Sequence, residues 1–112
     1  MIEITDEHMR EQLTRTREYS VVLLKAAEGH PAAGDDAVIW EHGRRNFQLR
    51  AEGLLSIVCP VQDHTELCGV GIFNASPQRT RELMEQDPGV RAGIFAYEIH
   101  PVRSFPGDCL PA

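Results

Sequence analysis

Cysteine is scarce in this chain, with three among 112 residues. A secreted disulfide framework usually carries a denser, even-numbered set, so we do not expect a fold stapled by disulfides. Basic charge is also in deficit, because the formal net charge is −6. Nucleic-acid phosphates require a basic surface, so we expect no nucleic-acid partner. The Arg44-Arg45 pair is too short to form such a surface and is assigned to the solvated side of a helix.

Long hydrophobic runs are missing as well, and none approaches the length needed to cross a bilayer. Residues 1–7 lack the basic and then apolar order of a signal peptide. We therefore expect no membrane partner and a cytoplasmic location. The sequence also has no glycine-rich phosphate loop, no G-x-S-x-G and no H-E-x-x-H, so nucleotide hydrolysis, serine hydrolase chemistry and zinc proteolysis are poorly supported.

What is present fits one globular domain over residues 1–112, with 42% hydrophobic and 25% charged residues. An N-terminal extension at 1–17 carries a short helix, and an irregular tail occupies 102–112. Between them the apolar patterns and turn signals predict strand, helix, strand, strand, helix and strand. These six elements are expected at 19–27, 36–52, 54–59, 67–73, 76–87 and 90–99.

This order is typical of the ferredoxin-like βαββαβ arrangement, an α+β fold with helices on one face of a four-stranded antiparallel sheet. The last strand is apolar on both sides. One side carries Phe95, Tyr97 and Ile99, and the other carries Val90, Ala92, Ile94 and Ala96. Two small helices cannot cover both faces of the sheet. We therefore predict a homodimer that packs sheet on sheet.

His42 and Asp87 are the main candidates for chemistry. A neutral imidazole can take or give a proton near neutral pH, and a carboxylate bonded to its other ring nitrogen would fix the tautomer. The two residues are 45 positions apart, so they meet only if the helix at 36–52 packs beside the end of the helix at 76–87. The alternative is a His–Asp bond that ties helix to strand without catalysis.

Two motifs resemble the YCII-related (YciI-like) family. His42 followed by Glu52-Gly53-Leu54 is similar to the family's first helix and its "EG-L-L" ending, and residues 87–94 are similar to its "DP-x-V-x-AG-aliphatic" signature. The resemblance spans residues 19–105. It implies a dimeric α+β barrel, an active site at His42 and Asp87, and small aromatic substrates, as in dehydrochlorination of a chlorinated hydroquinone. The chain departs from the family at Cys59-Pro60, where Gly-Pro is usual, and in its N-terminal helix and its tail.

Four further residues are candidates for substrate binding: Ser76, Asn46, Trp40 and Arg91. Ser76 is explained equally well as a helix cap, Asn46 and Arg91 as solvated surface, and Trp40 as packing. Ile39, Gly43, Phe47 and Arg50 are expected to share one face of the helix at 36–52, with His42 flanking it.

Cys59 and Cys68 are expected opposite each other across a hairpin, with His64 between them. Their spacing lacks the C-x-x-C pattern of zinc sites, so we expect two reduced thiols, no metal and no cofactor.

The sequence thus favours a cofactor-independent enzyme that uses His42 and Asp87 on a small, cyclic or aromatic substrate in a lyase, isomerase or dehalogenase step. The alternative is a non-catalytic ligand-binding or regulatory dimer with the same pocket. A purely structural dimerisation module is the third hypothesis.

Overall fold

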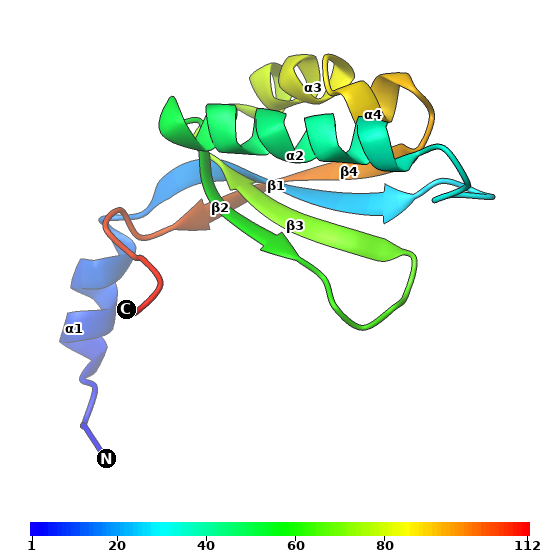
Figure 1. Ribbon diagram of the computed structural model, residues 1–112. Coiled ribbons are helices and arrows are strands. Elements are labelled where there is room, and N and C mark those ends of the chain that lie inside the picture. Colours follow the sequence, from blue (N-terminus) through cyan, green and yellow to red (C-terminus); the bar gives the residue numbers. More distant parts are fainter.

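The computed structural model describes residues 1–112 and is shown in Figure 1. It contains four helices and four strands, which in chain order are α1 (Asp6–Leu13), β1 (Arg17–Ala26), α2 (Asp36–Ala51), β2 (Leu55–Pro60), β3 (Leu67–Phe73), α3 (Pro77–Glu85), α4 (Pro88–Arg91) and β4 (Phe95–Ser104). None of the helices is both long enough and apolar enough to span a membrane.

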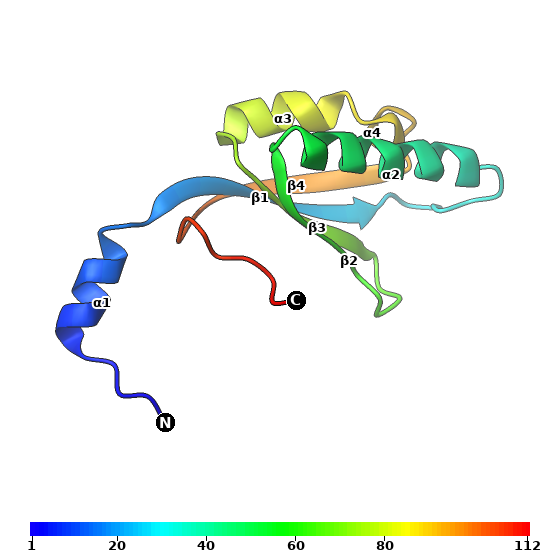
Figure 2. The same cartoon turned by 60° about the vertical axis from the view of Figure 1, so that its left-hand side comes forward.

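The sheet has the strand order β2-β3-β1-β4, and every neighbouring pair is antiparallel. β1 lies in the middle, where Val22 faces Gly71 on one side and Ile99 on the other. Helices α2, α3 and α4 all cover the same face of this sheet (Figures 1 and 2). The predicted ferredoxin-like α+β fold is therefore confirmed, with the short helix α4 inserted before the last strand.

The core lies between the sheet and these three helices. Val22 and Leu24 of β1 are buried because alternate residues of a strand point to the same face. They belong to a cluster of nine buried apolar side chains, namely Val22, Leu24, Leu49, Leu55, Phe73, Leu83, Met84, Ile94 and Phe95. This layer holds α2 against the sheet, where it packs on the edge strand β2.

Two local signals fix the helix ends as the sequence indicated. The Ser76 hydroxyl accepts a hydrogen bond from the Arg79 N–H at 3.1 Å, with Pro77 as the first residue of α3. Thr5 caps α1 in the same way through the His8 N–H at 3.1 Å.

The expected strand at 90–99 is wrong in its first half. Val90 and Arg91 are helical, and β4 begins only at Phe95. The physical reason is Asp87, whose side chain caps a further helical turn instead of ending the helical region. The strand also runs beyond the expected boundary, because Ser104 pairs with Arg17 at the start of β1. The first residues of the predicted irregular tail at 102–112 are therefore part of the sheet.

The sheet face away from the helices is apolar, but for a different reason from the one expected. On β4 this face carries Ala96, Glu98 and His100, all of them exposed. Apart from Val102 of β4, the apolar side chains come from the other three strands instead. They are half-buried in the single chain and include Tyr19, Val21, Leu23, Ile57, Val70 and Ile72. We call this surface the open face.

Candidate active site

The structure brings His42 and Asp87 together. His42 of α2 places its ring nitrogen Nδ1 at 2.8 and 2.9 Å from the two carboxylate oxygens of Asp87, the residue that caps α4. The side chains are 12% and 2% exposed. Because α2 packs directly on α4, residues 45 positions apart in sequence form one buried pair.

Three donors hold the Asp87 carboxylate in place. Its Oδ2 accepts the backbone N–H of Gly89 at 3.0 Å and that of Val90 at 3.1 Å, and His42 supplies the third. A buried carboxylate needs such partners to offset its lost hydration. Asp87 is therefore at once a helix cap and the fixed support of an imidazole.

The tautomer of neutral His42 follows from this contact. An ionised carboxylate has no hydrogen to donate, so Nδ1 carries the proton and Nε2 keeps a lone pair. The only side chain that approaches Nε2 is Asn46, one turn along α2, whose amide nitrogen is 3.4 Å away. This distance is long for a hydrogen bond. Nε2 is thus a weakly engaged base.

Phe95 sets the plane of the imidazole. The two rings lie 4.8 Å apart at their centroids, with 49° between their planes. Phe95 in turn lies against α4 at Gly89, where a Cβ atom would come within 2.5 and 2.8 Å of ring carbons of Phe95. A side chain at position 89 would therefore clash with Phe95. Through Phe95, the first turn of α4 is in contact with the His42 ring.

A pocket of about 400 Å³ lies between α2 and the sheet, and His42 and Asn46 line it. Of its 17 lining residues, ten are hydrophobic and none is Asp, Glu, Lys or Arg. The volume falls within the range of about 300–1,000 Å³ typical of small-molecule sites. An apolar pocket with two neighbouring polar side chains suits a small, uncharged ligand.

Two glycines form the floor of this pocket. Gly69 and Gly71 lie on the helix-facing side of β3, opposite Leu24 and Val22 of β1. A Cβ at Gly69 would make only ordinary contacts, 3.5 Å to the Cys59 carbonyl oxygen and 4.0 Å to the Leu24 Cβ. At Gly71, in contrast, a Cβ would come within 3.1 Å of the Leu55 Cδ1. The open space in the pocket therefore lies over Gly69, where the inward position lacks a side chain.

These glycines were not identified from the sequence, and the residues of α2 that face the sheet were predicted only in part. Leu49 is buried, whereas Phe47, which was expected on the inner face, is 70% exposed, and Arg50 is exposed too. The true inner face runs through Ile39, His42, Asn46 and Leu49. The G-x-G spacing inside an apolar strand was the signal that could have revealed the cavity.

The other predicted substrate-binding residues lie outside the pocket. Trp40 is 68% exposed, Arg91 is exposed at the end of α4, and the Ser76 hydroxyl caps α3. Of the four, only Asn46 joins His42.

Arg45 was assigned to the solvated side of α2, but it is half-buried. Burial lowers the pKa of its guanidinium, and attraction to the Asp87 carboxylate partly opposes that change. A positive charge therefore lies within reach of the Asp87 side of the pair, whereas Arg44 is exposed and pairs with Glu41.

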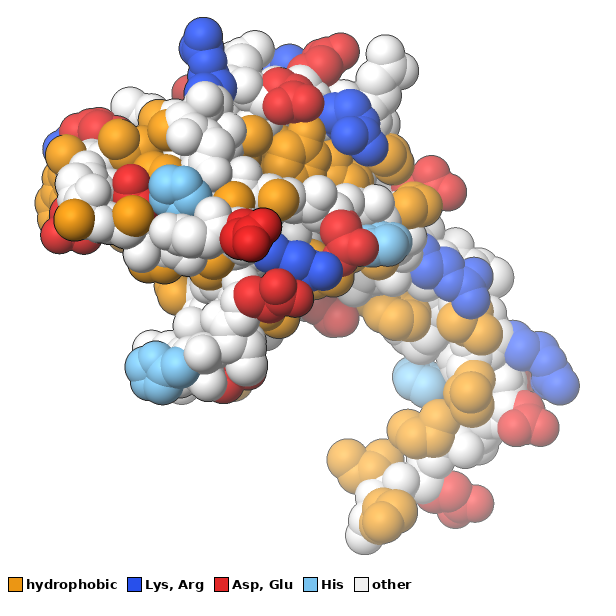
Figure 3. Space-filling view, turned by 90° about the vertical axis from the view of Figure 1, so that its right-hand side faces the viewer, with side chains coloured by type: hydrophobic (Ala, Val, Ile, Leu, Met, Phe, Trp, Pro, Cys, Tyr) orange, Lys and Arg blue, Asp and Glu red, His pale blue; other side chains and the backbone are white.

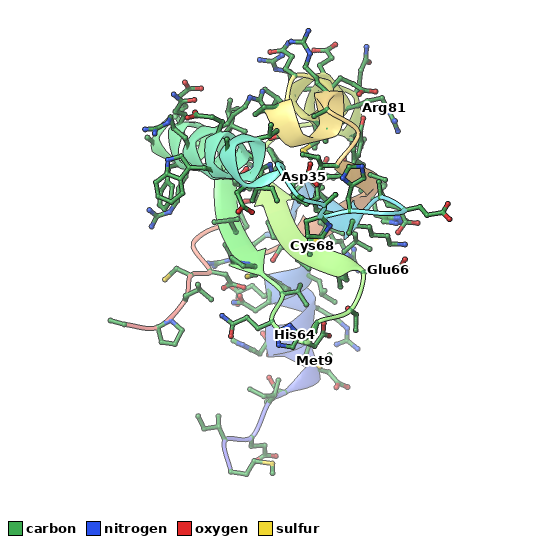
Figure 4. The ribbon with its side chains drawn as sticks, turned by 45° about the vertical axis from the view of Figure 1, so that its right-hand side comes forward. Met9, Asp35, His64, Glu66, Cys68 and Arg81 are labelled. Carbon is green, nitrogen blue, oxygen red and sulfur yellow. The ribbon has the colours of Figure 1, made fainter.

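The β2–β3 hairpin forms as predicted, but the expectation that Cys59 and Cys68 lie opposite each other across it is wrong. Cys59 pairs with Val70 and lies on the open face, whereas Cys68 packs against the core on the other side. His64 lies in the connection between β2 and β3 (Figure 4), where it and Cys68 border one small hollow. No group of three or more His, Cys, Asp or Glu side chains is arranged to hold a metal ion.

A second His–Asp pair was not foreseen. In the loop before α2, the His30 Nδ1 lies 2.7 Å from the Asp35 Oδ2, which also accepts the Ala32 N–H at 2.5 Å. These hydrogen bonds lower the pKa of Asp35, and the one to His30 has the larger effect. Pro31, next to His30, borders the pocket, but neither His30 nor Asp35 lines it.

Comparisons with known proteins add little to this geometry. No family model matches the sequence, and no curated protein matches it. Among solved structures, the chain is similar to the 5-chloro-2-hydroxyhydroquinone dehydrochlorinase of Burkholderia phenoliruptrix in complex with 2,5-dihydroxybenzoquinone. That match has a TM-score of 0.48 and 15% identity, and it covers 72% of this chain and 90% of the other.

Proposed function

We propose that this protein is a cofactor-independent acid/base enzyme that acts on a small, uncharged, cyclic or aromatic substrate. The observation that carries the proposal is the His42 Nδ1–Asp87 hydrogen bond, which leaves Nε2 as a free base beside an apolar pocket of about 400 Å³. A lyase, isomerase or dehalogenase step fits, because each needs a proton to be removed from the substrate. Membership of the YCII-related family, from the motifs at 42–54 and 87–94, belongs to the same proposal, as does a cytoplasmic location.

In the proposed step, the Nε2 lone pair of His42 takes a proton from a carbon or oxygen of the substrate. The imidazolium that forms is stabilised by the Asp87 carboxylate at Nδ1. The electron pair left on the substrate expels a leaving group or shifts a double bond. Nε2 then gives its proton to the leaving group or to a new carbon position, which restores the enzyme. Asn46 lies where its amide can hold a substrate oxygen next to Nε2.

The alternative is a non-catalytic ligand-binding or regulatory protein with the same pocket. The observation that favours it is the absence of a charged side chain in the lining, since only His42 would then supply chemistry. A purely structural module is the weakest of the three hypotheses, because the protein's own side chains leave the pocket open.

A ligand screen followed by a turnover assay tests the proposal. Small uncharged cyclic and aromatic compounds would be screened by thermal shift against wild type, His42→Ala and Gly69→Val. Gly69→Val fills the floor without touching His42. His30→Ala is the matched control, since it removes an imidazole outside the pocket.

We expect compounds that bind wild type and His30→Ala, that bind His42→Ala more weakly, and that do not bind Gly69→Val. At least one such compound should be converted by wild type and not by His42→Ala. Binding without any conversion would favour the ligand-binding alternative. Equal binding to all four proteins would remove this pocket from the function.

We also propose a homodimer formed through the open face. Its half-buried side chains Val21, Leu23, Val70 and Ile72 form an apolar surface that no helix covers. Sedimentation velocity would be expected to give twice the chain mass for wild type and one chain mass for Val70→Glu. A wild-type monomer at all concentrations would contradict this part of the proposal.

A further inference from the structure

The N-terminal arm, residues 1–13, is detached from the body of the protein. No residue of α1 is buried. The apolar side chains of the arm are largely exposed, namely Ile2 (84%), Ile4 (56%), Met9 (51%) and Leu13 (45%). In the space-filling view the arm extends away from the body, with hydrophobic side chains near its tip (Figure 3). The radius of gyration is 16.5 Å, against about 13 Å expected for a compact chain of this length.

A second hollow, of about 670 Å³, lies beside the C-terminal tail and is lined both by open-face strand residues and by Phe47 and Arg50 of α2. Nine of its 16 lining residues are hydrophobic, among them Tyr19, Ile72 and Val102 from the sheet and Phe105 and Leu110 from the tail. The hollow is separate from the His42 pocket, since Val58 is the one residue that lines both. It is an apolar site with no occupant from its own chain.

The charges of the hollow and of the arm are complementary. Arg17 and Arg50 line the hollow together with one carboxylate, Asp108, so the charged lining is net positive by one. Neither arginine forms a salt bridge; Arg17 makes a 3.2 Å hydrogen bond to Asn74 and lies over the Tyr19 ring at 5.5 Å from its centroid. The first seven residues of the arm carry three carboxylates and no basic side chain, at Glu3, Asp6 and Glu7. None of these carboxylates has an ion-pair partner within its own chain.

Local hydrogen bonds direct the arm away from the hollow of its own chain. Arg17, which lines the hollow, is only four residues beyond Leu13, the last residue of α1. The end of the helix is tied by Arg15 to Glu11 at 2.7 Å and by the Thr14 hydroxyl to the Glu11 carbonyl at 2.6 Å. With these contacts in place, the N-terminus lies beyond the end of α1 that is farther from β1 (Figures 1 and 2).

We propose that the arm of one copy of this chain occupies the hollow of a second copy, and that the exchange is reciprocal. Ile2 and Ile4 enter the apolar lining, while the arm carboxylates face Arg17 and Arg50. A two-fold axis makes both contacts equivalent, as in most homodimers. The inference rests on the homodimer proposed above, and it does not depend on the acid/base activity.

A disulfide trap tests the exchange, because the native Cys109 lines the hollow. Ile4→Cys would be made in a Cys59→Ser background and oxidised at low protein concentration. We expect a covalent dimer on a non-reducing gel that disappears when Cys109→Ser is added. Arg10→Cys, an exposed site in the last turn of α1, is the matched control and should give no covalent dimer.

Three results would overturn the inference. An oxidised monomer would mean that the arm folds back onto its own chain. A covalent dimer that persists with Cys109→Ser would mean that the arms meet each other. If no disulfide forms in a protein that still sediments as a dimer, the arm is not part of the interface, and the dimer through the open face is retained. A wild-type monomer, in contrast, would remove the dimer itself.

A second measurement checks the contact without cysteines. Ile2→Asp with Ile4→Asp should raise the dimer dissociation constant by on the order of tenfold or more, because two buried isoleucines would be lost from the interface. Binding of pocket ligands should be retained, since neither residue lines that pocket. An unchanged dissociation constant would contradict the inference.

Discussion

The molecule contains two His–Asp pairs that share the same contact but differ in sequence separation and in burial. In both, an Nδ1 atom lies within 2.9 Å of a carboxylate oxygen. His30 and Asp35 are five residues apart in one loop, and their side chains are 29% and 14% exposed. His42 and Asp87 come from two helices and are 12% and 2% exposed.

The difference shows that the surroundings, and not the pair, make a candidate active site. Asp35 closes a loop, because it also accepts the Ala32 N–H. Asp87 caps a helix on one side and supports an imidazole on the other, and that imidazole borders an apolar cavity. A His–Asp contact alone would have given both pairs the same role.

The largest expected difference between the pairs is in stability. Asp87→Ala removes a helix cap and leaves two backbone N–H groups and the His42 Nδ1 without a partner. We expect a loss of about 3 kcal/mol in the free energy of unfolding, measured in urea at pH 7. Asp35→Ala should cost clearly less, because its partners can turn to water. Equal losses would contradict the distinction.

The next difference is in ligand binding. His42→Gln should weaken the affinity for any pocket ligand by on the order of tenfold, through the lost hydrogen bond at Nε2. For a converted substrate, kcat should fall by about 10²- to 10⁴-fold. His30→Gln should leave both quantities unchanged in the same titration and assay. A larger effect from His30→Gln would move the candidate site to the loop.

The position of the His42 ring can be tested at Gly89, which packs against Phe95, and at Gly43, the next residue in α2. Gly89→Ala places a methyl group against the Phe95 ring, so we expect a loss of about 1–3 kcal/mol in stability and weaker ligand binding. Gly43→Ala on α2 meets no atom within 4 Å and should raise stability by up to about 1 kcal/mol. Thermal unfolding of both variants measures this contrast. A stable Gly89→Ala would show that Phe95 moves freely.

The smallest effect is the pH dependence of the loop pair. The His30 and Ala32 hydrogen bonds lower the pKa of Asp35 below its ordinary value of 3.8. A carboxyl group with a lowered pKa in the folded state stabilises the fold above the unfolded-state pKa, and this contribution is lost as the pH falls through the folded-state value. Wild type should therefore be more stable than Asp35→Asn at neutral pH, and the gap should close below pH 3.8. A gap that is constant with pH would contradict this assignment.

The fold was predictable because its signals are local and consistent. The Ser76-Pro77 cap, the apolar run of β1 and the strand order along the chain all gave the ferredoxin-like arrangement. Helix α4 was not predictable in the same way. Pro88 and Gly89 read as a stop, yet the Asp87 side chain caps one more turn.

The site was only partly predictable, for a related reason. His42 and Asp87 were identified from chemistry and motif, but their contact depends on how α2 packs on α4. The inner face of α2 includes His42 and Asn46, two polar residues that weaken the hydrophobic pattern and shift its apparent direction toward Phe47. A functional position is where such a pattern is expected to fail.

The ring ¹⁵N NMR spectrum of His42 tests the proposed base most directly. At a pH where the imidazole is neutral, we predict a protonated Nδ1 and an unprotonated Nε2, with the Nε2 signal changing when a pocket ligand binds. His42→Gln assigns the signal by its loss, and His30 serves as the internal reference. A protonated Nε2 in the free protein, or an Nε2 signal that does not respond to a bound ligand, would contradict a role for His42 as the base.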